Sequence, residues 1–148
     1  RIYIATMQAF DEESHRRIRR HRHMRAGKGF ETIERYTELD ELLIPKDCVV
    51  LLECMSNLVA NEMFAENKIR LRDEVTAQIL DGIEALNSQL AHFLIVTNNV
   101  FEDGISYEET TAEYIEAMGQ VNERLAAMAD TVIEVVAGIP VVWKGTLL

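Results

Sequence analysis

The sequence predicts an α/β fold in which a mostly parallel sheet is flanked by helices. Short runs of apolar and β-branched residues alternate with longer amphipathic segments, which is the pattern of successive strand–helix–strand units. Of the 148 residues, 48% are hydrophobic and 27% are charged, enough apolar material for the core of one domain. We see no repeat, linker or low-complexity tract, and therefore expect residues 1–148 to form a single α/β domain.

The first half of the chain is predicted to form three strands and two helices. In order, these are a strand at 2–6, a helix at 14–26, a strand at 30–36, a short helix before Pro45 and a strand at 48–54. Asp11 is a suitable N-cap for the first helix, and Gly27 and Gly29 end it. The segment at 48–54, CVVLLEC, is apolar throughout, which predicts a central parallel strand with both faces covered.

The second half is predicted to be mainly helical, with strands at two places. In order, these are helices at 55–65 and 67–91, a buried strand at 92–99, a helix at 107–129 and strand material at 131–145. The helix at 67–91 carries a stripe of apolar residues, namely Ile69, Val75, Ile79, Ile83, Leu86 and Leu90. Gly138 and Pro140 interrupt the last segment, which indicates a hairpin or a bent edge strand.

Charge and cysteine content narrow the class of protein. The net charge of −10 argues against a general nucleic-acid-binding protein, although residues 1–28 carry eight Lys and Arg against three acids. Cys48 and Cys54, on one strand, would lie too far apart for a disulfide, which indicates a reducing compartment. No apolar run is long enough to span a membrane and no signal peptide is recognisable, so we expect a cytoplasmic location.

The local basic charge lies on the first helix. Arg17, His21 and Arg25 recur at intervals of four residues, which predicts a histidine flanked by two guanidinium groups on one face. Guanidinium groups bind phosphate, and nearby positive charge favours the neutral imidazole that can act as a nucleophile. The alternatives are a solvated basic face, a zinc site made by the helix's histidines, and a nucleic-acid-binding helix; the last two fit poorly because the histidines point in different directions and no aromatic residues interleave.

Two strand ends carry polar groups that suit a ligand. Glu53 ends the strand at 48–54, and ligands of open α/β sheets bind at the carboxyl ends of strands, where a carboxylate commonly holds Mg²⁺ on a nucleotide. The alternative is a carboxylate that only bonds loop amides. Thr97, Asn98 and Asn99 form a second polar strand end. The sequence contains no G-x-x-x-x-G-K-[ST], G-x-G-x-x-G or G-x-S-x-G motif.

Several segments, in this order, resemble one known family. They are YIATMQAFDEE, RIRRHRHMR, TIE, VVLLECMSNLVANEMF, VTNNVFEDGI and VNERLAAMADTVIEVVAGIPV. Together they resemble the bifunctional adenosylcobinamide kinase / adenosylcobinamide-phosphate guanylyltransferase of cobalamin biosynthesis, over nearly the whole chain.

The resemblance implies a nucleotide-binding domain of the RecA-like, P-loop NTPase type and a homotrimer. It also implies two reactions: ATP or GTP, with Mg²⁺, phosphorylates adenosylcobinamide, and GTP then guanylylates an enzyme histidine that passes GMP to the phosphorylated substrate. The product is adenosylcobinamide-GDP. The partners implied are adenosylcobinamide and the two nucleotides, with no nucleic acid and no membrane span.

The resemblance also assigns residues by motif. His21 matches the guanylylated histidine, and Glu53 is the possible Mg²⁺ ligand. The segments that match nucleotide-contacting residues are Ala5, Thr6 and Met7; Arg22, His23, Met24 and Arg25; and the acids Glu34 and Glu53.

The chain departs from the family's pattern in two ways. Family members begin with a strand and a phosphate loop before Y-I-A-T, so we expect the domain to be N-terminally incomplete, with a gap or exposed edge beside the strands at 2–6 and 48–54. Asn99 stands where the family usually has Glu. The competing hypothesis is a non-catalytic nucleotide- or corrinoid-binding remnant, or a subunit that lacks the phosphate loop.

Overall fold

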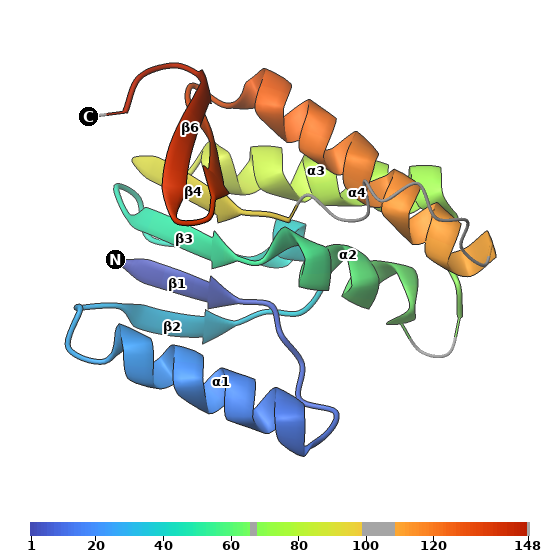
Figure 1. Ribbon diagram of the computed structural model, residues 1–148, viewed down its shortest axis with the longest axis horizontal. Coiled ribbons are helices and arrows are strands. Elements are labelled where there is room, and N and C mark those ends of the chain that lie inside the picture. Colours follow the sequence, from blue (N-terminus) through green and yellow to red (C-terminus); the bar gives the residue numbers. More distant parts are fainter. Residues whose placement is uncertain (66–67, 99–108, 148) are drawn as a thin grey trace.

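The centre of the computed structural model is a four-stranded parallel sheet (Figure 1). The structure describes residues 1–65, 68–98 and 109–147. The sheet consists of β1 (Ile2–Ala5), β2 (Glu31–Glu34), β3 (Val49–Glu53) and β4 (His92–Val96), in the order β2-β1-β3-β4. Every pairing in it is parallel, which confirms the predicted α/β class and the central position of the strand at 48–54.

The helices connect these strands, and a separate hairpin follows them. The helical elements are α1 (Glu12–Arg25), the 3₁₀ turn η1 (Leu39–Glu41), α2 (Met55–Met63), α3 (Arg72–Asn87) and α4 (Glu109–Met128). The hairpin consists of β5 (Val132–Val136) and β6 (Ile139–Lys144). None of the helices in the described ranges is long and apolar enough to cross a membrane.

The core lies on one face of the sheet. Alternate residues of β1 and β3, among them Ile4, Val50 and Leu52, are fully or almost fully buried together with residues of α2, α3 and α4. Val75, Ile79, Ile83 and Leu86 of the predicted stripe on α3 belong to this core. Helix α1 lies apart from these helices, beside β2 (Figure 1).

The opposite face is covered less than the sequence predicts. On β3 only every second residue is buried, and Val49 is 37% exposed. On β4, Leu94 is 52% exposed, so the expectation of a buried strand is wrong for one of its faces. The apolar run at 48–54 predicted two covered faces because composition reports apolarity but not which elements pack on the strand. Helix α3 also begins later than predicted, and Ile69 lies before it, 63% exposed.

The expected gap beside the first and third strands is absent, and that expectation is wrong. β1 pairs directly with β3, with Tyr3 opposite Leu51 and Ala5 opposite Glu53, and each strand has a second neighbour. β1 is hydrogen-bonded to β2 and β3, and β3 is hydrogen-bonded to β1 and β4, so neither β1 nor β3 has an unpaired edge. Among the described residues, the outer edges of the sheet are those of β2 and β4.

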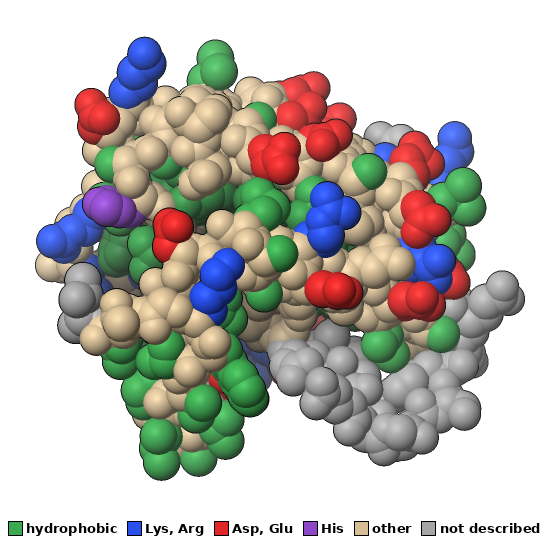
Figure 2. All heavy atoms as spheres, turned by 90° about the horizontal axis from the view of Figure 1, so that it is seen from above, with side chains coloured by type: hydrophobic (Ala, Val, Ile, Leu, Met, Phe, Trp, Pro, Cys, Tyr) green, Lys and Arg blue, Asp and Glu red, His purple; other side chains and the backbone are tan. Residues whose placement is uncertain are grey.

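The C-terminal hairpin presents apolar side chains to solvent. Its turn places Ala137 and Gly138 at positive φ, as tight hairpins require, which confirms the predicted hairpin. Val135, Ile139 and Trp143 are 65% to 69% exposed. In Figure 2, hydrophobic side chains gather on a lobe whose position corresponds to that of the hairpin in Figure 1.

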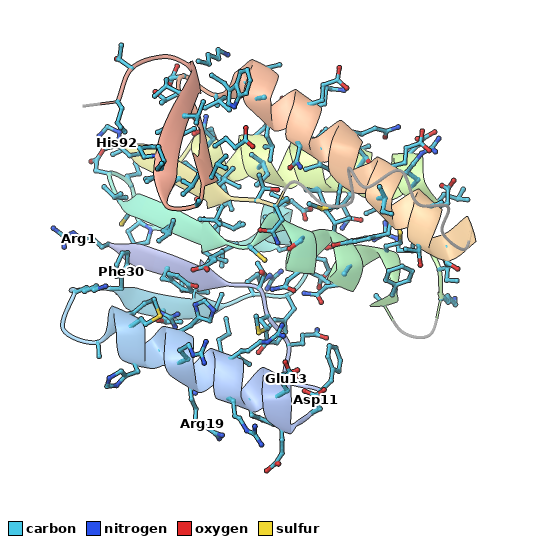
Figure 3. All side chains as sticks on the ribbon, in the orientation of Figure 1. Arg1, Asp11, Glu13, Arg19, Phe30 and His92 are labelled. Carbon is cyan, nitrogen blue, oxygen red and sulfur yellow. The ribbon has the colours of Figure 1, made fainter. Side chains whose placement is uncertain are left out.

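Helix α1 carries a side-chain cap at its N-terminus and is largely exposed. None of its residues is buried, and Arg19 points away from the sheet (Figure 3). Asp11 caps its first turn as predicted, because Asp11 Oδ1 accepts hydrogen bonds from the backbone N and the Oγ of Ser14, at 2.7 and 2.6 Å. The hydrogen bond from the Ser14 hydroxyl is the main cause that holds the pKa of Asp11 below its ordinary value.

We expect Asp11→Ala to loosen the first turn of α1 and Asp11→Asn to preserve it, since Asn still accepts the Ser14 hydrogen bonds. Because the pKa of Asp11 is lowered on folding, the charged cap stabilises the helix above the ordinary carboxyl pKa and loses this effect as pH falls through the lowered value. Amide hydrogen exchange of residues 13–16 measures both effects. Equal protection in the Ala and Asn variants would contradict the role of the cap.

Candidate active site

All four parallel strands end at one cavity. Their last residues, Ala5, Glu34, Glu53 and Val96, all line a cavity of about 180 Å³. This is the edge at which open α/β sheets bind their ligands, because parallel strands bring their carboxyl ends and the loops that follow to the same side. Glu53 and Asn98, which the sequence places at separate strand ends, therefore line the same cavity, whereas Thr97 does not.

Helix α1 forms the opposite wall of the cavity. It contributes Ile18, His21, Arg22 and Arg25, at spacings of three and four residues that place them on one side of the helix. The remaining lining residues are Tyr3, Met7, Cys54, Asn57 and Asn98. The cavity thus combines an imidazole, two guanidinium groups and two carboxylates.

His21 faces the carboxylate of Glu53. The distance from His21 Nδ1 to Glu53 Oε1 is 3.7 Å, and the two side chains are 36% and 31% exposed. At this distance the groups interact electrostatically without a direct hydrogen bond, and catalytic hydrogen bonds are often long before substrate binds. Since Nδ1 faces Glu53, the other ring nitrogen, Nε2, does not take part in this contact.

Glu53 is held in turn by Tyr3. The Tyr3 hydroxyl donates a hydrogen bond of 2.6 Å to Glu53 Oε2, and the guanidinium carbon of Arg25 lies 3.7 Å from the centre of the Tyr3 ring. Burial first, and then the hydrogen bond to Glu53, raise the pKa of the Tyr3 phenol. The phenol is therefore protonated at neutral pH and acts as a donor.

Arg22 forms an ion pair with Glu34 at the end of β2. The Tyr36 hydroxyl also donates to Glu34, at 3.3 Å, and burial together with the charge of Glu34 raises the pKa of Tyr36. Arg25 makes the cation–π contact with Tyr3 but no ion pair within 4.0 Å among the described residues. An anion that enters the cavity would meet the guanidinium of Arg25 and compete with Glu34 for Arg22.

The structure brings most of the predicted site residues together. Those that line the cavity are Ala5, Met7, His21, Arg22, Arg25, Glu34 and Glu53, whereas Thr6, His23 and Met24 are not among the lining residues. Arg17 lies one helical turn before His21 on α1, as the spacing predicts, but it does not line the cavity and forms an ion pair with Glu13 at 2.7 Å. Asn99 lies outside the described residues, but its neighbour Asn98 lines the cavity.

Thr6 has a structural role that the motif did not reveal. Its side chain is fully buried, and its Oγ1 both donates to the backbone oxygen of Cys54 and accepts from the backbone nitrogen of Cys54, each at 2.8 Å. The hydroxyl thereby joins the chain beyond β1 to the chain beyond β3. This connection joins the ends of the two central strands, which both line the cavity.

Sequence reasoning missed Tyr3, Ile18, Cys54, Asn57 and Val96 as lining residues. Ile18 alone had a usable signal, since it lies three residues before His21 on the same helix. Tyr3 reaches the site because β1 pairs with β3 in a register that places Tyr3 diagonally beside Glu53. That register is not visible in either strand alone.

The residues of the site suit Mg²⁺ only as part of a metal–nucleotide complex. Among the described residues, no group of three His, Cys, Asp or Glu side chains is placed to hold a metal ion. Mg²⁺ usually binds through one or two carboxylates together with substrate phosphates. Glu53 fits that pattern because its carboxylate has lone pairs beyond those facing Tyr3 and His21.

The fold and the site define a class: a parallel α/β protein whose strand ends, with a basic helix, form a cavity suited to an anionic ligand. Residues 1–143 match the family described as "Cobinamide kinase / cobinamide phosphate guanyltransferase". The chain belongs to this enzyme family, which confirms the resemblance inferred from its motifs.

Curated relatives from three bacteria agree with this assignment. The chain is 35% identical to the "Bifunctional adenosylcobalamin biosynthesis protein CobU" of Escherichia coli (strain K12), over 95% of the chain and 83% of the relative. It is 34% identical to the protein of the same description from Salmonella typhimurium (strain LT2), with the same coverage. It is 27% identical to the "Bifunctional adenosylcobalamin biosynthesis protein CobP" of Pseudomonas aeruginosa PAO1, over 97% of the chain and 82% of the relative.

We expect Thr6→Val to destabilise the protein by about 1–3 kcal/mol, because it leaves the partly buried N–H of Cys54 without its side-chain partner and the C=O of Cys54 with only the N–H of Leu58. Thr6→Ser keeps the hydroxyl and serves as the matched control. Chemical denaturation of both variants measures the difference in free energy of unfolding. A Thr6→Val variant as stable as the unchanged protein would contradict this role of the hydroxyl.

Proposed function

We propose that the protein acts in cobalamin biosynthesis as an adenosylcobinamide kinase and adenosylcobinamide-phosphate guanylyltransferase. The observation that carries this proposal is His21, which lies in the cavity at the strand ends with Glu53 3.7 Å from its Nδ1 and Arg22 and Arg25 on the same wall. A nucleophilic imidazole beside groups that neutralise phosphate is what transfer of GMP through a histidine requires.

In the guanylyltransferase reaction, His21 Nε2 attacks the α-phosphorus of GTP. A bond forms between Nε2 and phosphorus, the bond from phosphorus to the bridging oxygen breaks, and its electron pair leaves with pyrophosphate. Glu53 stabilises the proton that stays on Nδ1 as the ring gains positive charge, and Arg22 and Arg25 neutralise charge on the phosphates. The phosphate of the phosphorylated corrinoid then attacks the same phosphorus and takes GMP from His21.

In the kinase reaction, the aminopropanol hydroxyl of adenosylcobinamide takes a phosphoryl group from ATP or GTP. We propose a domain of the P-loop NTPase type in which Mg²⁺ arrives with the nucleotide and is held in part by Glu53; it would supply charge neutralisation on the phosphates. The cavity at the carboxyl ends of a parallel sheet supports this proposal. Tests of activity are best made on protein that includes any coding sequence upstream of Arg1.

We further propose, as the resemblance implies, that the protein forms a homotrimer in the cytoplasm. The exposed apolar side chains of the β5–β6 hairpin support self-association, since contiguous apolar surface on a soluble protein commonly marks a contact. Light scattering of the purified protein measures the molar mass directly.

We expect His21→Asn to abolish covalent labelling of the intact protein by α-labelled GTP in the presence of Mg²⁺. His15→Asn and His23→Asn are matched controls on the same helix, and neither side chain lines the cavity. A histidine phosphoramidate is labile in acid and stable in base, so the label should be lost at low pH. Undiminished labelling of the His21 variant would overturn the proposal, and absence of labelling in the unchanged protein would favour a non-catalytic remnant.

We expect Glu53→Gln to lower the labelling rate about 10- to 100-fold while changing the free energy of unfolding little, because a strand-end carboxylate contributes little to the core. Glu41→Gln is a matched control: Glu41 forms an exposed ion pair with Arg35 outside the cavity. Rapid-quench labelling and chemical denaturation give the two quantities. A labelling rate that falls only in proportion to a lowered free energy of unfolding would indicate that Glu53 has only a structural role.

A further inference from the structure

Tyr3 lines the cavity and is buried, but it has no role in the guanylyl transfer described above. It is 4% exposed and lies on the face of the sheet toward α1. Its ring lies edge-on to Phe30 at 6.1 Å between centroids, and the guanidinium of Arg25 lies on the ring at 3.7 Å. Packing from two directions thus fixes the direction of its hydroxyl group.

That hydroxyl connects the fixed ring to the carboxylate beside His21. It donates a 2.6 Å hydrogen bond to Glu53 Oε2, and the second oxygen, Oε1, is the atom that faces His21 Nδ1. A carboxylate with one oxygen bonded in this way cannot rotate freely about its last torsion. Without the bond, Glu53 could turn toward the guanidinium groups of Arg22 and Arg25, which line the same cavity.

We propose that Tyr3 is a positioning residue for guanylylation: by holding Glu53 Oε2 it keeps Oε1 against His21 Nδ1 and so presents His21 Nε2 to the α-phosphorus of GTP. This inference rests on the proposed function of His21. Tyr3 does not touch the reacting atoms, and it acts only through Glu53. Its effect falls on the rate of the chemical step, because the orientation of the imidazole matters when the bond from Nε2 to phosphorus forms.

The test is Tyr3→Phe in the intact protein, which removes one oxygen and keeps the ring between Phe30 and Arg25. We expect the maximal labelling rate with α-labelled GTP and Mg²⁺ to fall about tenfold, and the GTP concentration for half-maximal rate to change less than about twofold. Tyr114→Phe is the matched control, since it removes a 3.1 Å hydrogen bond from a partly buried tyrosine to the backbone oxygen of Ser56.

A double-mutant cycle with Glu53→Gln separates positioning from a structural effect. If Tyr3 acts through Glu53, Tyr3→Phe should cost almost nothing further in the Glu53→Gln background. Additive losses, or a loss in Tyr3→Phe that only follows its thermal stability, would overturn the inference while leaving the role of His21 intact. If the unchanged protein carries no label on His21, the proposed function itself fails, and this inference fails with it.

Discussion

The parallel pairing of β1 with β3 is the constraint on which the site depends. This pairing places Ala5 opposite Glu53 and Tyr3 opposite Leu51, so that Tyr3 and Glu53 lie diagonally on one face of the sheet. The Tyr3 hydroxyl reaches Glu53 only in this register, because a shift by one residue would turn Tyr3 to the core face. The two hydrogen bonds of Thr6 Oγ1 to the Cys54 backbone extend the connection beyond the strand ends.

The two walls of the cavity differ in how they are held. The sheet is fixed by its hydrogen bonds and by a core of fully buried side chains such as Ile4 and Leu52. Helix α1 buries none of its residues, and it meets the sheet through polar contacts, the Arg22–Glu34 ion pair and the stacking of Arg25 on Tyr3. Both contacts involve side chains that line the cavity, so an anion that binds Arg22 or Arg25 also acts on the attachment of the helix.

Positive charge is concentrated on helix α1, although the chain as a whole is acidic. The net charge is −10, but the helix at the cavity is basic, and two of its guanidinium groups, those of Arg22 and Arg25, line the cavity together with the strand-end carboxylates of Glu34 and Glu53. The carboxylates partly neutralise the basic wall before a ligand arrives. A triphosphate that binds Arg22 would therefore replace Glu34 as the partner of its guanidinium group.

Local patterns in the sequence determined the α/β class, the helix that follows the Asp11 cap, the hairpin, and the family. They also indicated His21, Arg25 and Glu53, because helical spacing and strand ends are properties of single segments. The order β2-β1-β3-β4, the open face of β4 and the meeting of Tyr3, Glu53 and His21 were decided by the tertiary structure. The physical reason is that these features depend on which strand pairs with which, in what register, and on which face a helix packs. The contact of Tyr3 with Glu53, for example, joins residues 50 positions apart.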